Sequence, residues 1–245
     1  MIKFFRHIRK SLLEQNKMGR YFKYAIGEIT LVMIGILLAL QVNNWNEQQK
    51  KKTLKNEYVT SLINDFTKDT TQLNARLLRN NVRLDRIGTI SDSIILSHKN
   101  NYKNIIELFS NAFSGVRITN VYNTNSFNLL ISSGNIDLLD KNIRTELMEL
   151  NRLQGFEQAV QDGNSEYLFK YLENIGLKYP HSFGRFSSGA IYKSLWDNTN
   201  TKDLPKDMIS FLSQETYTIN RYIELTNDVL KQTELVLKLL YQLND

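Results

Sequence analysis

An apolar run near the N-terminus, residues 24–45, most constrains what this chain can fold into. Its centre, residues 29–40, carries no charge and only one polar side chain, Thr30. As a helix, the run would extend about 33 Å, which is enough to cross a hydrocarbon layer of about 30 Å. Tyr24 and Trp45 stand at its two ends, where interfacial aromatic residues are typical. The run predicts a membrane-spanning helix; the alternative is a buried core helix of a soluble domain.

The charge of the chain is concentrated before this run. Residues 1–23 hold seven Lys and Arg side chains and one acid, a net charge of +6. The whole chain also has a net charge of +6, from 31 basic and 25 acidic residues, so residues 24–245 are neutral with 24 of each. A basic charge confined to a short tail argues against a nucleic-acid partner. Lys50, Lys51, Lys52 and Lys55 follow the run and blur this asymmetry without reversing it.

The positive-inside rule therefore predicts a cytoplasmic tail (1–23), a transmembrane helix (24–45) and a domain (46–245) on the far side of the membrane. The tail is longer than the basic region of a secretion signal, and residues 38–41 lack a small-x-small cleavage site. The chain has no cysteine for a lipid or a disulfide. We expect an uncleaved signal anchor.

The tail has an amphipathic pattern. Its apolar residues recur at three- and four-residue steps and its basic residues fall largely elsewhere on the helical wheel; they are Ile2, Phe5, Ile8 and Leu12, and Lys3, Arg6, Arg9 and Lys10. This pattern favours a helix lying on the anionic inner leaflet. The alternative is a solvated basic tail.

After the run, the sequence predicts an all-α domain. Two long stretches show alternating four- and three-residue spacing of mostly apolar residues, which indicates two long helices packed in a bundle. The first stripe is Val59, Ile63, Phe66, Thr70, Leu73, Leu77, Asn80, Leu84, Ile87, Ser91 and Ile94, widened by Leu62, Leu78, Val82 and Ile90. The second stripe is Met208, Leu212, Glu215, Ile219, Tyr222, Thr226, Val229, Thr233, Val236, Leu240 and Leu243. We expect the two stripes to form one antiparallel core.

Shorter helices are predicted between the stripes, at residues 103–113, 124–133, 141–161 and 165–177. Gly115, Gly134-Asn135, Asp162-Gly163 and Gly176 are predicted to interrupt the chain around them. Pro205 suits the first turn of the last helix, with Asp203 as a cap. The stretch 178–204 is the least regular, and no linker divides residues 46–245 into two domains.

Catalytic and metal-binding patterns are absent from the sequence. Only His7, His98 and His181 occur, without the spacing of metal ligands, and no phosphate-binding glycine loop is present. Acidic and basic residues alternate along the first long helix: Asp65, Asp69, Asp85 and Asp92 among Lys68, Arg76, Arg79, Arg83 and Arg86. This mixture is typical of a solvated helix face. We expect no enzyme activity, cofactor or metal.

Three residues of the apolar run are candidates for contacts with another transmembrane helix. Glu28 is an acid within the run, and a carboxylate in lipid is costly unless it is paired or functional. Gly35 and Ala39 form a small-x-x-x-small pair on roughly the same side, which suits close helix packing. The alternative for Glu28 is a position at the cytoplasmic interface, in reach of water or a tail cation.

The segments MIKFFR (1–6) and YAIGEITLVMIGILLALQVNNWNE (24–47) resemble the opening of an uncharacterised family of Bacteroidota membrane proteins. The segment YNTNSFNLLISSGNIDLL (122–139) is similar to that family more loosely. The resemblance implies an inner-membrane protein with a periplasmic helical domain, and it carries over no catalytic residue.

Three functions remain open at this point. The first is an interaction or scaffold domain, a subunit or accessory of an envelope complex that binds other membrane or periplasmic proteins or a second copy of itself. The second is a ligand-sensing domain that signals through a partner, although a 23-residue tail is too short for an output domain of its own. The third, an envelope hydrolase, would need an acid pair in the irregular residues 178–204, and Arg185 is the only charged side chain between Lys178 and Lys193.

Overall fold

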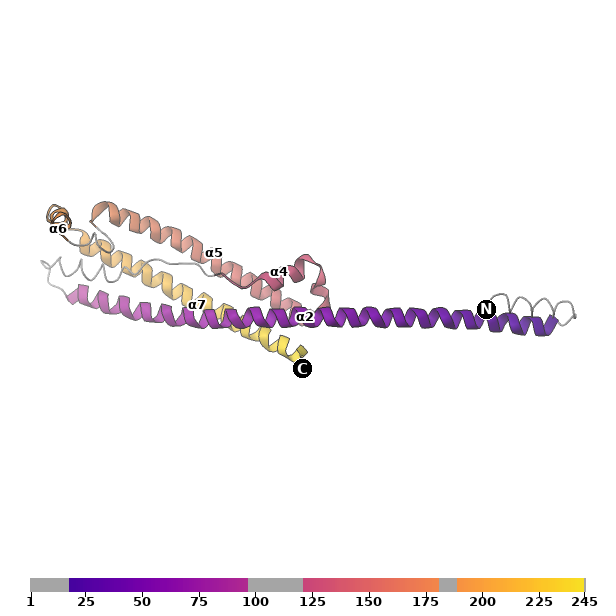
Figure 1. Ribbon diagram of the computed structural model, residues 1–245. Coiled ribbons are helices and arrows are strands. Elements are labelled where there is room, and N and C mark those ends of the chain that lie inside the picture. Colours follow the sequence, from indigo (N-terminus) through magenta and orange to yellow (C-terminus); the bar gives the residue numbers. More distant parts are fainter. Residues whose placement is uncertain (1–17, 97–120, 181–188, 245) are drawn as a thin grey trace. The chain divides into compact units, whose positions relative to one another are not determined.

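The computed structural model describes residues 18–96, 121–180 and 189–244, and all their regular elements are helices. In chain order these are α2 (Met18–Leu96), α4 (Asn125–Ser132), the 3-10 helix η1 (Asn135–Leu138), α5 (Lys141–Lys178), α6 (Ala190–Asp197) and α7 (Leu204–Asn244) (Figure 1). The predicted all-α class is confirmed for these residues. The predicted helix 103–113, Gly115 and the basic tail residues Lys3, Arg6, Arg9 and Lys10 lie outside them.

The chain divides into two compact units, residues 1–57 and 58–245. In the first unit, the described residues belong to α2, and their large apolar side chains are exposed, from Ile26 (62 %) to Trp45 (62 %). Among the described helices, α2 alone is long and apolar enough to cross a membrane, and none of its most apolar stretch is buried. This part of α2 is therefore a candidate span by length and composition and has no protein core of its own.

The second unit is a bundle of three long helices: α2 from residue 58 onward, α5 and α7. Both predicted stripes face its interior. Ten of the eleven residues of the second stripe are buried, with Leu243 partly buried, and no residue of the first stripe is exposed. Leu78 (67 % exposed) and Val82 (59 %) were wrongly predicted to widen the first stripe. Both residues were assigned to the core because they are apolar. In the structure they lie on the side of α2 that faces away from α5 and α7.

Side-chain contacts fix the direction of the helices. Along α5, Glu146, Glu157 and Gln161 meet Gln232, Thr226 and Tyr222 of α7, so α5 and α7 run antiparallel. Tyr58 of α2 meets Ser133, just before α5, and Arg76 meets Glu157, so α2 and α5 run parallel (Figure 1). The two helices that carry the stripes are thus antiparallel, as expected.

The helix α5 corrects the predicted break at Asp162-Gly163. Residues 141–161 and 165–177 belong to one continuous helix, which also passes through Gly155 and Gly176. Each interior glycine costs a helix about 0.5–1 kcal/mol relative to alanine. Leu147 and Leu150 before the expected break and Leu168 and Ile175 after it are buried on one face of α5. Their packing against neighbouring helices stabilises the helix on both sides of the glycines, which is the physical reason the break does not form.

The predicted turn at Gly134-Asn135 and the start of the last helix near Pro205 are confirmed, but the predicted interruption at Gly176 is wrong, because Gly176 lies inside α5, which continues to Lys178. Gly134 has φ 70° after α4, a left-handed conformation that suits glycine. Pro205 lies in the first turn of α7, and the Asp203 carbonyl accepts the backbone N–H of Asp207 at 3.0 Å. Helix α5 ends one residue before Tyr179-Pro180. In the described part of the stretch 178–204, residues 190–197 form a short helix, α6, which the sequence did not predict.

An apolar cluster fills one end of the bundle. It joins side chains of α2, α5 and α7 with Tyr179 and is covered by Trp196 of α6, whose ring stacks on Tyr179 with centroids 6.5 Å apart. The buried members are Ile87, Ile90, Ile94, Leu168, Ile175, Tyr179, Leu204, Met208, Phe211, Leu212 and Ile219. Because all three long helices contribute, this cluster stabilises the bundle as one unit.

Two leucines on α2 allow the contribution of core packing to stability to be measured apart from that of helix propensity, because the same substitution can be made at a buried and at an exposed position. Leu73 is fully buried and Leu78 is 67 % exposed. We expect Leu73→Ala to lower the free energy of unfolding by about 2–5 kcal/mol, because it leaves a cavity in the bundle. Leu78→Ala, the same substitution on the outer face, should change it by less than about 0.5 kcal/mol. Urea unfolding of the full-length protein in detergent, followed by circular dichroism, measures both; equal effects would contradict this packing.

Candidate functional site

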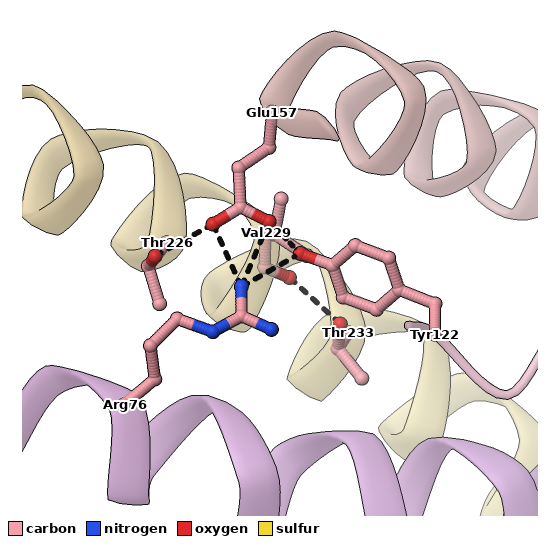
Figure 2. Close-up of polar contacts among 6 residues, drawn as sticks. All are labelled: Arg76, Tyr122, Glu157, Thr226, Val229 and Thr233. Carbon is pink, nitrogen blue, oxygen red and sulfur yellow. Dashed lines mark hydrogen bonds and ion pairs between the residues drawn. The ribbon is translucent and has the colours of Figure 1, made fainter. Parts of the chain in front are cut away.

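The middle of the bundle holds a layer of polar side chains centred on Glu157. Arg76 of α2, Glu157 of α5, Thr226 of α7 and Tyr122 from the segment before α4 converge there (Figure 2). The exposed fractions are 6 % for Arg76, 8 % for Tyr122 and zero for Glu157 and Thr226. Four separate parts of the chain therefore meet at one carboxylate that is closed to solvent.

The Glu157 carboxylate accepts hydrogen bonds on both oxygens. Arg76 Nη1 lies 2.9 Å from Oε1 and 3.0 Å from Oε2. Thr226 donates its hydroxyl to Oε1 at 2.6 Å, and Tyr122 donates its hydroxyl to Oε2. A buried carboxylate tolerates ionisation only with this kind of compensation from an opposite charge and several donors. The guanidinium carbon of Arg76 is also 5.5 Å from the Tyr122 ring centroid, a cation–π distance.

The segment before α4 is held to α2 by two acids one turn apart. Asp69 Oδ1 accepts the backbone N–H of Asn123 at 3.0 Å and its side-chain N–H at 2.7 Å. Asp65 accepts the backbone N–H of Ser126, in the first turn of α4, at 3.3 Å. Thr124, at the N-cap position of α4, makes no side-chain cap bond. The positive end of α4 is thus stabilised by a carboxylate of another helix.

Asp69 is 1 % exposed, and its second oxygen, Oδ2, has no hydrogen-bond partner among the described residues. Burial raises the pKa of its carboxyl above the ordinary value, against the lowering effect of the bonds from Asn123. We infer that Asp69 contributes to positioning the Tyr122 segment at some cost in burying its charge.

A second ion pair crosses the bundle between Arg83 of α2 and Glu215 of α7. The Glu215 side chain is 3 % exposed and that of Arg83 is 26 % exposed. Burial raises the pKa of the Glu215 carboxyl, and the Arg83 charge partly opposes this shift. Within the described chain, Glu215 Oε2 also has no hydrogen-bond partner. This pair links α2 to α7, as Arg76 links α2 to α5.

The polar layer suits alignment of helices rather than chemistry on a substrate. Glu157, the group with the most convergent donors, is fully buried and already saturated by protein hydrogen bonds. An ion pair of this kind fixes which turns of the three helices lie side by side, because a slip of one turn would leave a buried charge unpaired. Within the described residues, no group of three or more His, Asp or Glu side chains is placed to hold a metal ion.

The sequence-predicted site residues lie elsewhere. Gly35 and Ala39 are exposed on α2, and a Cβ added at Gly35 would meet no atom within 4 Å. Glu28 is partly exposed on the same helix. No described contact tests the proposed packing of these residues against another span, so it stays a prediction. The membrane-surface residues Lys3, Arg6, Arg9 and Lys10 fall outside the described chain.

The prediction that the charges of the first long helix form a solvated face is wrong for Asp69, Arg76 and Arg83, which all engage in buried or half-buried contacts. The sequence does carry one signal of the polar layer. On α5 the buried residues Ile143, Leu147, Leu150, Gln154, Glu157 and Gln161 follow a four-three repeat. Glu157 thus occupies a position that faces the core, as Glu215 does in the second stripe. A charged residue on a core position predicts a buried partner.

Comparisons with known proteins add one finding. A family model described as a family of unknown function (DUF6090) matches residues 28–208, which is most of the chain. The matched range includes part of the 24–47 segment and all of the 122–139 segment that carried the resemblance to an uncharacterised family. No curated protein and no solved structure matches the chain.

The ion pair between Arg76 and Glu157 predicts that removing one charge lowers the free energy of unfolding much more than removing both. Glu157→Gln keeps the shape but leaves Arg76 as an unpaired buried charge, and we expect it to cost about 3–5 kcal/mol of unfolding free energy. Adding Arg76→Met removes that charge, so the double variant should recover most of the loss. Arg79→Met, on the exposed side of α2, is the matched control and should stay within about 0.5 kcal/mol. Additive losses in the double variant, measured by urea unfolding in detergent, would contradict a coupled pair.

Glu215 predicts a pH dependence of opposite sign to ordinary acid unfolding. Its folded pKa is raised above the ordinary 4.5, so between the two values the folded protein holds a proton that the unfolded chain has lost. Stability from this group is therefore fully present below pH 4.5 and is lost as pH rises through the folded pKa. Relative to Glu215→Gln, which cannot titrate, the wild type should become more stable as pH falls from about 7 toward 4.5. Parallel stability curves for the two proteins would rule out the shift.

Proposed function

We propose that this chain, which belongs to the DUF6090 family, is a single-pass inner-membrane protein whose periplasmic helical bundle binds other proteins of the cell envelope. In this proposal the N-terminal tail is cytoplasmic, and the protein is a subunit or accessory of an envelope complex and not an enzyme. A second copy of the chain is one possible partner.

The exposed apolar part of α2 supports the membrane anchor. Twelve large apolar side chains between Ile26 and Trp45 are more than half exposed: Ile26, Ile29, Leu31, Val32, Met33, Ile34, Ile36, Leu37, Leu38, Leu40, Val42 and Trp45. In water this surface would be strongly unfavourable, at about 25 cal/mol per Å² of apolar area. A hydrocarbon layer removes that cost, and the basic tail would then contact the anionic inner leaflet. Glu28, Gly35 and Ala39 remain the residues proposed to face a partner span.

Aromatic side chains on the bundle surface carry the proposal of protein binding. The long helices α5 and α7 leave Phe156 (45 %), Tyr167 (52 %), Phe169 (55 %) and Tyr217 (65 %) exposed. A shallow groove between the same helices is lined by Leu153 and Leu235 among polar residues. Aromatic residues supply much of the energy of protein–protein interfaces, and these four are exposed on the two helices that line the groove.

The polar layer supports this proposal indirectly. It directs the buried acids inward, where they pair with Arg76 and Arg83 and are not presented to a substrate. Ion pairs at fixed positions hold α2, α5 and α7 in one alignment, so the exposed side chains of α5 and α7 keep constant relative positions. A surface that is fixed before binding loses less entropy when a partner docks.

Purification of the full-length protein in mild detergent from its natural host tests the proposal. The test variant is Phe156→Glu, and the matched control is Gln158→Glu, which adds the same charge at another exposed position of α5. We expect one protein, in constant stoichiometry, to co-purify with the wild type and the control and to be lost from Phe156→Glu. Thermal melts of the two variants should agree within a few degrees, because neither position is buried.

Three outcomes count against the scaffold proposal. The first is that no protein co-purifies in a constant ratio. The second is that Phe156→Glu and Gln158→Glu retain the partner equally. The third is that a small molecule co-purifies instead of a protein. The last outcome would favour the ligand-sensing alternative.

A further inference from the structure

We propose that Lys50, Lys51 and Lys52 bind the phosphate groups of anionic lipids at the end of the transmembrane segment that lies away from the basic tail. This inference rests on the proposed membrane span. The proposed site faces the leaflet opposite to the one assigned to the tail. Its ligand is the anionic lipid of that leaflet.

The three lysines are spread around the helix at nearly one height, an arrangement we call the lysine ring. They do not share one face of the helix, as residues that contact a partner helix would. They are consecutive residues in α2, so their side chains leave the helix at steps of about 100° and differ in height by only about 3 Å in total. A partner helix contacts residues three and four apart, which share one face. A ring of charge at one depth instead suits a planar layer that surrounds the helix, as lipid headgroups do.

The depth of the ring fits the headgroup layer. Trp45, an aromatic residue at the end of the apolar run, suits the boundary of the hydrocarbon. Lys50 comes five residues later in the same helix, about 7.5 Å further along its axis. The polar interface on each side of a bilayer is about 5–7 Å thick. Lysine stems are long enough to bring the ammonium groups back to the phosphates from this height.

The positive charges of Lys50, Lys51 and Lys52 are accessible to a lipid phosphate. All three side chains are exposed, and in the described part of the chain none of them forms an ion pair. The nearest preceding acid, Glu47, accepts a hydrogen bond from the Asn43 side chain at 3.4 Å. Each Lys or Arg close to an anionic lipid surface is attracted to it electrostatically.

Quenching of Trp45 by brominated lipids tests the site. The chain has two tryptophans, so Trp196→Phe leaves Trp45 as the only reporter, about 7.5 Å from the ring. The full-length Trp196→Phe protein is reconstituted into phosphatidylcholine vesicles that contain a small, equal fraction of brominated phosphatidylglycerol or brominated phosphatidylcholine. We expect the anionic lipid to associate with the Trp45 region about two- to five-fold more strongly. Lys50→Gln/Lys51→Gln/Lys52→Gln should bring the ratio to one, and high salt should lower it.

A matched control carries the same kind of change on the other side of the span: Lys3→Gln/Arg6→Gln/Arg9→Gln/Lys10→Gln should keep the preference at Trp45. A ratio of one in the parent protein, or a preference that survives the triple substitution or vanishes in the tail control, overturns the lysine site while the span stands. Absence of quenching by either lipid shows that the segment is not in the bilayer, and then the proposed anchor fails as well.

Discussion

A carboxylate buried in the middle of a helical bundle needs an opposite charge and hydrogen-bond donors next to it. For Glu157, these groups come from three other parts of the chain. Taking an isolated carboxylate out of water costs several kcal/mol, and no solvent reaches Glu157 to offset this. Arg76 supplies the opposite charge, and the hydroxyls of Tyr122 and Thr226 supply the remaining donors. We infer that this contact sets the relative alignment of α2, α5 and α7, because a slip of one turn would leave a buried charge unpaired.

The same requirement explains why the segment before α4 lies against the bundle. Tyr122 reaches Glu157, and the next residue, Asn123, donates its backbone and side-chain N–H groups to the buried Asp69. Asp65 then receives a backbone N–H from the first turn of α4. Two acids of α2 and one acid of α5 therefore hold a short irregular segment that has little apolar surface with which to anchor itself.

The division of roles within the molecule follows from where charge and apolar surface lie. The bundle buries Asp69, Glu157 and Glu215 and leaves several aromatic side chains of α5 and α7 exposed, which suits binding to another protein. The first unit shows apolar side chains on every side of α2 between Ile26 and Trp45 and then a ring of lysines, which suits a bilayer with charged headgroups. Each surface matches one kind of environment, and this match links the structure to the proposed membrane scaffold.

The sequence by itself determined the helical class, the candidate span and the two stripes. Helical periodicity and apolar length are local properties: a residue three or four positions away is a neighbour whatever the rest of the chain does. The sequence could not decide that Leu78 points outward, that α5 runs unbroken through Gly163, or that Arg76 is buried. These depend on which helix packs against which face, and on whether a charge finds a partner eighty residues away. Glu157 and Glu215 stood at core-facing positions in the sequence, but only the tertiary structure supplied Arg76 and Arg83, because an ion pair between distant segments exists only after the helices have packed.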